Sequence, residues 1–166
     1  MKTGTIEQRF RAFMLILAGL LCLGTIVELW LAEHTHDLVQ LIPFVLCGLG
    51  SIAIVAALMR PRRRVLFALR LVAALLIGGS LFGMYEHVEQ NLAFELEIRP
   101  AATFGDVWFD ALRGASPLLA PGILALAGVL ALASTYQHPV LVPRRVTQDG
   151  LLPSATSSIT LRSNDS

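Results

Sequence analysis

The stretch ELWLAEHTHDLVQLIP, residues 28–43, is a short acidic turn with two histidines between two long apolar runs. It begins with a carboxylate, Glu28, that still belongs to the first apolar run. Apolar runs in lipid must satisfy their backbone hydrogen bonds internally and are therefore helical. A polar turn between two such runs predicts a helical hairpin. The rest of the chain repeats this arrangement, so residues 28–43 decide the fold class that we expect.

The composition indicates that lipid is the solvent for most of the chain. Hydrophobic residues make up 55% and charged residues 15% of the 166 residues, and the mean hydropathy is +0.67. A soluble domain carries about 25% charged residues. The one basic run, residues 60–64, lies between two apolar segments. The sequence therefore shows no nucleic-acid-binding surface.

Four apolar runs are each long enough to cross a bilayer, because about 20 helical residues span about 30 Å of hydrocarbon. These runs are residues 13–31, 38–59, 65–85 and 117–136. We predict an all-α membrane protein in which four transmembrane helices form two hairpins of one bundle, within a membrane domain of residues 1–142. The Ser/Thr-rich tail, residues 143–166, has no apolar period and is expected to be disordered in the cytoplasm.

The distribution of charge predicts the orientation of the chain. Basic residues dominate the N-terminal arm, the connection at 60–64 and the tail, whereas acidic residues dominate the other two connections. Basic segments stay on the cytoplasmic side of a membrane. Both termini are therefore expected in the cytoplasm, with loops 32–37 and 86–116 outside.

The long outer loop, residues 86–116, carries two patterns. Leu92, Phe94, Leu96 and Ile98 alternate with mostly polar residues, which predicts a short strand-like stretch over 92–98, ended by Pro100. Apolar residues then recur at helical spacing from Phe104 to Leu112. This second pattern predicts a short amphipathic helix in the outer membrane interface, with Trp108 at the level of the head groups.

Small residues mark two faces for close helix packing, Gly79-x-x-x-Gly83 and Ala127-x-x-x-Ala131. The Gly79/Gly83 face and the outer segment 86–116 are two surfaces through which the protein could meet a membrane-protein partner or a second copy of itself. Cys22 and Cys47 both lie inside apolar runs and are expected to be small fillers of the bundle.

Candidate functional residues gather on the outer side. Glu28 and Gln40 are expected at a similar depth, because the first run ends and the second begins just beyond them. The third run ends at Tyr85, which places Glu86 and His87 at the same rim. His34, His36 and Asp37 belong to the adjoining turn.

Three interpretations of this group stay open. In the first, these are ordinary polar residues of outer loops. In the second, His34, His36 and His87, with Asp37 or Glu86, bind a metal ion or a haem, because imidazole and carboxylate groups suit zinc, copper or iron. In the third, Glu28 and Gln40 form an intramembrane polar site for an ion or a quinol, because an ionisable group inside a span is a functional candidate.

The runs ELWLAEHTHDLVQLIPF, GMYEHVEQNLAFELE and GASPLLAPG resemble those of a set of small bacterial four-span membrane proteins. The resemblance covers nearly all of the chain except the tail. It implies a multi-pass protein of the bacterial cytoplasmic (inner) membrane, and it carries no activity and no residue roles, because none is known for that set.

The expected function is that of an integral membrane accessory or interaction protein that presents an acidic cap outside the cytoplasm. No motif of a hydrolase, kinase, nucleotide-binding loop or zinc protease is present, so we expect no enzyme. The alternatives are a small metal- or haem-binding redox component that uses the outer histidines, and an ion or quinol site at Glu28.

Overall fold

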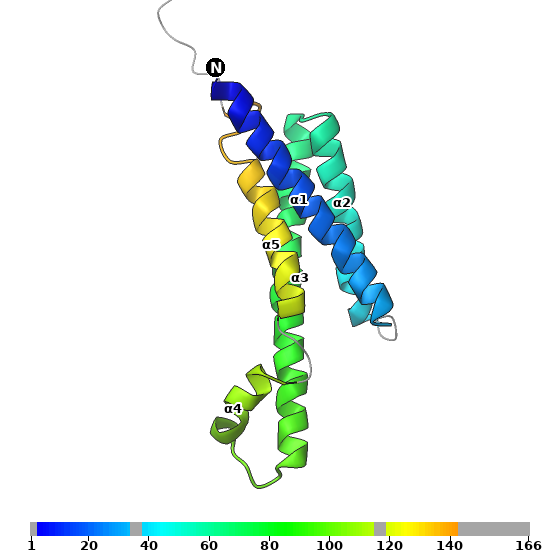
Figure 1. The fold of residues 1–166 in the computed structure, drawn as a ribbon, viewed down its shortest axis with the longest axis vertical. Coiled ribbons are helices and arrows are strands. Elements are labelled where there is room, and N and C mark those ends of the chain that lie inside the picture. Colours follow the sequence, from blue (N-terminus) through cyan, green and yellow to red (C-terminus); the bar gives the residue numbers. More distant parts are fainter. Residues whose placement is uncertain (1–2, 34–37, 115–118, 143–166) are drawn as a thin grey trace, which may run out of the picture.

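The computed structural model describes residues 3–33, 38–114 and 119–142, and every regular element in these ranges is a helix. The elements are α1 (Thr3–Leu31), the 3-10 turn η1 (Val39–Leu41), α2 (Ile42–Met59), α3 (Arg63–Ile98), α4 (Phe104–Leu112) and α5 (Leu119–Ser134) (Figure 1). The tail from residue 143 onward lies outside the described residues. The chain is therefore all-helical where it is described.

Three of these helices are long and apolar enough to cross a membrane: α1, α2 together with η1, and α3. The apolar helix α5 is shorter. Large apolar side chains point outward from the helices, for example Ile52 at 69% and Leu71 at 64% exposure. Such a surface is stable in lipid and costly in water. Its helices identify the chain as a membrane protein.

The helix α3 is the central element of the arrangement, and it runs along most of the length of the molecule (Figure 1). Helix α5 lies along the first half of α3, and the antiparallel pair α1 and α2 crosses the same half (Figure 1). The pair then diverges from α3 toward the connection between α1 and η1 (Figure 1). The buried core of Leu69, Leu76 and their neighbours therefore lies at the end of the molecule where the helices are together.

Helices α3 and α5 approach each other closely because α5 has small residues on the facing side. Ala127, Gly128 and Ala131 are buried. A Cβ atom added at Gly128 would lie 2.7 Å from the backbone oxygen of Ala73 in α3. Gly128 thus packs against α3, and Ala127 and Ala131 of the predicted small-residue face are buried in the same core.

The Gly79/Gly83 face of α3 packs against other helices of the same chain. A Cβ atom added at Gly79 would collide with the side chain of Leu46 in α2, and one added at Gly83 would lie 3.4 Å from Cβ of Pro121 in α5. Between them, the Ser80 hydroxyl donates a hydrogen bond of 2.5 Å to the carbonyl oxygen of Pro121. These contacts fix the beginning of α5 on α3.

Two arginines fix the other end of α5, where the last backbone carbonyls have no partner within the helix. Arg11 of α1 donates to the carbonyl oxygens of Ser134 at 2.9 Å and Tyr136 at 2.6 Å. Arg70 of α3 donates to the hydroxyl of Thr135 at 2.9 Å and to its carbonyl oxygen at 3.0 Å. The positive charges also oppose the partial negative charge at this helix end. Three helices are joined here.

The prediction of a strand-like stretch over 92–98 is wrong, because α3 continues without a break to Ile98. The alternating residues form two pairs at helical spacing. Leu92 and Leu96 are half-buried, whereas Phe94 and Ile98 are exposed. The predicted third span ends at residue 85, but the helix extends beyond it by about 20 Å. We call residues 86–114, which comprise this extension and α4, the outer arm.

The second helix predicted in this region is confirmed as α4. Thr103 and Asp106 form a capping box at its start. The backbone N–H and the hydroxyl of Thr103 donate to the carboxylate of Asp106 at 2.8 and 2.7 Å. The hydrogen bond from the hydroxyl has the largest effect and that from the backbone N–H the next, and together they hold the pKa of Asp106 below its ordinary value. The cap gives this short helix a defined beginning.

Polar contacts hold α4 against the extension of α3. The buried side-chain amide of Asn91 donates to the carbonyl oxygen of Ala111 at 3.0 Å. At the far end, Arg99 bridges Glu95 at 2.5 Å and Asp110 at 2.6 Å. The hydrogen bond to Asp110, followed by that to Glu95, raises the pKa of Arg99. The outer arm therefore has its own internal contacts.

We predict that Arg70→Ala lowers the free energy of unfolding in detergent by about 2 kcal/mol, because it removes charged hydrogen bonds to the end of α5. Denaturant titration followed by circular dichroism measures this change. Arg64→Ala is the matched control, since Arg64 lies in the first turn of the same helix and is exposed. An equal loss of stability in both variants would contradict the role assigned to Arg70.

Candidate functional site

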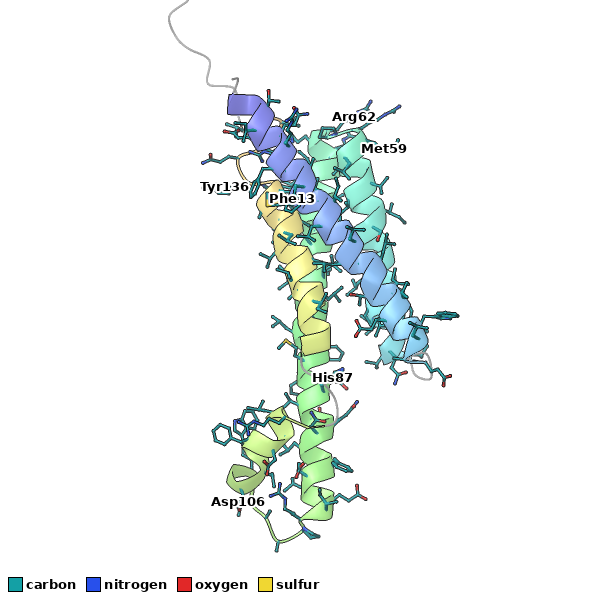
Figure 2. All side chains as sticks on the ribbon, viewed as in Figure 1. Phe13, Met59, Arg62, His87, Asp106 and Tyr136 are labelled. Atoms are coloured by element: carbon teal, nitrogen blue, oxygen red, sulfur yellow. The ribbon has the colours of Figure 1, made fainter. Side chains whose placement is uncertain are left out.

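A cavity of about 690 Å³ lies where the α1–α2 pair diverges from α3 and α5. All four helices and η1 contribute to its lining. Its wall is largely apolar, with Leu29 from α1, Leu46 from α2, Phe82 from α3 and Leu124 from α5. Figure 2 shows His87 on α3 at the level where the α1–α2 pair ends. The cavity thus lies at the boundary between the apolar spans and the outer arm.

Besides Thr25, whose hydroxyl is bound to the backbone of its own helix, five side chains with carboxylate, amide or imidazole groups belong to this lining: Glu28, Gln40, Glu86, His87 and Gln90. Glu28 lies in the last turn of α1, Gln40 in η1, and the other three in α3. The structure therefore brings together Glu28, Gln40, Glu86 and His87, which sequence analysis placed at one depth. It adds Gln90, one turn beyond Glu86, which the sequence analysis did not single out.

The position of Gln40 follows from the beginning of α2. Pro43 lies in the first turn of α2, where its fixed φ and missing N–H are well tolerated. The chain before it forms η1 instead of a further α-helical turn, and the backbone N–H of Leu41 donates to the carbonyl oxygen of Leu38. This turn lets Gln40 line the cavity.

Glycines on α3 widen the cavity. Gly79 and Gly83 both line it, and neither has a side chain to fill the space between α3 and its neighbours. Because Gly79 leaves room for the side chain of Leu46, a larger residue there would force that side chain to move. Gly79 and Gly83 therefore allow close packing of α3 against its neighbours and also leave space for the cavity.

The predicted set of metal or haem ligands is only partly described. His87 and Glu86 line the cavity, whereas His34, His36 and Asp37 lie outside the described residues. The described ranges contain no group of three His, Cys, Asp or Glu side chains that could hold a metal ion. The metal and haem hypothesis remains a prediction about the complete set of histidines.

The two cysteines, one in α1 and one in α2, belong to the buried core of the bundle. Cys22 and Cys47 are both free thiols and fully buried. A Cβ atom added at Gly50 would lie 3.3 Å from Sγ of Cys22, so the absence of a side chain at Gly50 makes room for the pair. Both cysteines are buried in the bundle, as the sequence predicted.

The carboxylates of the described cavity lining are not accompanied by lysine or arginine. Glu28 and Glu86 contribute two carboxylates from two different helices, and no lysine or arginine is among the described lining residues. Charges interact more strongly in an apolar environment than in water. The arrangement suits a molecule with an apolar body and a polar end that donates hydrogen bonds.

The helices and this cavity define a helical membrane protein with an internal cavity near one end of its spans. Comparisons of the chain with family models, with curated proteins and with solved structures find no match. The site must therefore be interpreted from its own residues.

Proposed function

We propose that this protein binds a lipid-soluble amphipathic molecule in the cavity, with the polar end of the ligand against Glu28, Gln40, Glu86 and His87. The observation that supports this function is one cavity that combines an apolar wall with polar residues from separate helices. Its volume falls in the range of small-molecule sites, about 300–1,000 Å³. The interpretation of Glu28 and Gln40 as an ion or quinol site belongs to this proposal.

We further propose the placement of the protein in its membrane. Helix α5 joins the three long helices as a fourth span, and both termini lie in the cytoplasm of a bacterial cell whose inner membrane holds the protein. The basic residues at 60–64 support this orientation. The cavity then faces the outer leaflet, and the divergence of the α1–α2 pair from α3 supports entry of the ligand from the lipid (Figure 1).

Filling the cavity is expected to displace the ligand. Leu29→Trp adds a large side chain to the apolar wall, so native mass spectrometry of protein purified in mild detergent should show the fraction carrying a lipid-soluble adduct fall about tenfold. Leu23→Trp is the matched control, because Leu23 lies on the same helix, is exposed and does not line the cavity.

The control variant should keep the adduct of the parent protein. A parent without any adduct, or an adduct retained equally in both variants, would contradict binding in this cavity. Circular dichroism of both variants verifies that the helices are intact, so that a loss of adduct reports on the cavity and not on the fold.

A second candidate function is that of an accessory protein that presents an acidic cap to a basic partner. The observation that favours it is the outer arm, which carries exposed carboxylates at Glu89, Glu97, Asp106 and Asp110. The contacts of Asn91 and Arg99 give this surface a defined shape.

A photo-crosslinking amino acid at Phe109, which is 71% exposed on the outer arm, tests this second function in living cells. It should yield one discrete protein adduct, and Asn91→Ala should reduce the yield several-fold because α4 loses its buried hydrogen bond. The same crosslinker at Phe13, an exposed residue of α1 far from the arm, is the control. Adducts of equal pattern at both positions would contradict a specific partner of the arm.

A further inference from the structure

The carboxylates of the cavity, Glu28 and Glu86, have no lysine or arginine beside them in the lining that the structure describes, and His87 is the one residue of that lining that can carry a positive charge. The only ion pairs among the described residues are those of Arg99 with Glu95 and Asp110. Arg70 is bound to Thr135 at the opposite end of the spans. The segment 34–37, which follows α1, contains His34, His36 and Asp37 and no lysine or arginine. No permanent positive charge of the described lining therefore balances the two carboxylates.

Glu28 is exposed and Glu86 is half-buried, and an opposite charge placed close to a carboxylate stabilises it. Glu28 and Glu86 approach the cavity from α1 and α3, so a group inside the cavity lies between helices that each carry a negative charge. A phosphate or carboxylate head group would be repelled here. A cation would be attracted, and an ammonium group could also donate hydrogen bonds to the amide oxygens of Gln40 and Gln90.

We infer that the ligand of the cavity is a lipophilic cation: an alkyl chain against the apolar wall and an ammonium head group between Glu28 and Glu86. This inference rests on the proposed function and specifies its ligand class. Leu46, Phe82 and Leu124 form the wall for the alkyl chain. The charge complementarity selects a cationic amphiphile over the anionic phospholipids that surround the protein.

The experiment uses the full-length protein in nanodiscs of phosphatidylcholine, a lipid without net charge. Binding is measured for three probes of similar chain length: dodecylammonium, dodecyl phosphate and a decyl-substituted hydroquinone. Dodecylammonium should bind with the highest affinity, and dodecyl phosphate should show no saturable binding.

Two variants with the same loss of charge then locate the cation. Glu28→Gln with Glu86→Gln should weaken dodecylammonium binding about tenfold or more, because two opposite charges near the head group are lost. Glu89→Gln with Glu97→Gln removes two exposed carboxylates of α3 that do not line the cavity. This control should change the affinity by less than about twofold, because neither carboxylate lines the cavity and salt screens charges that lie farther from the ligand.

Three results would overturn the inference. These are equal effects of the two double variants, tighter binding of dodecyl phosphate, and tighter binding of the hydroquinone. In the last two cases, a loss of binding in Leu29→Trp would show that the cavity still holds an amphiphile and that only the cationic class is wrong. If no probe binds and Leu29→Trp has no effect on the retained adduct, the proposed function itself fails.

Discussion

The unpaired carbonyl groups at the end of α5 impose the constraint on which the arrangement depends. In an apolar environment, such groups must find donors within the protein. Arg11 and Arg70 supply them from α1 and α3, so three helices are joined at one end of the molecule. At the other end, the α1–α2 pair runs away from α3 (Figure 1). The helices are therefore close at one end and diverge at the other.

This divergence gives the cavity its position and its chemistry. Helices α1 and α2 pack against each other, so the two helices leave α3 as a pair (Figure 1). The opening lies where the spans meet the outer arm, which explains why apolar and polar residues share one lining. Gly79 and Gly83 keep the α3 side of the opening free of bulk. The fold thus gives the carbonyl groups at the end of α5 their hydrogen-bond donors, and at the opposite end of the bundle it leaves an apolar space lined by two carboxylates.

Much of this arrangement was predictable from single positions. The apolar runs anticipated the helices, and the depth of Glu28, Gln40, Glu86 and His87 along those runs anticipated that they would lie near one another. The alternation from Leu92 to Ile98 led to the wrong prediction of a strand, because the pattern does not record that α4 packs against this segment. In a helix the same residues form two pairs, and no glycine or proline interrupts α3 between Gly83 and Pro100. The divergence of the α1–α2 pair, and with it the role of Gln90, depends on packing between distant segments that no local pattern records.

The most direct test of this account locates an alkyl chain inside the protein. Nuclear Overhauser effects between protonated dodecylammonium and protein methyl groups can be measured in nanodiscs of deuterated lipid. The account predicts contacts to Leu46 and Leu124, which line the cavity, that exceed those to Leu49 and Leu126, exposed residues of the same two helices. Equal contacts to all four leucines, or contacts to the exposed pair alone, would show that the chain lies in the surrounding lipid and would contradict the account.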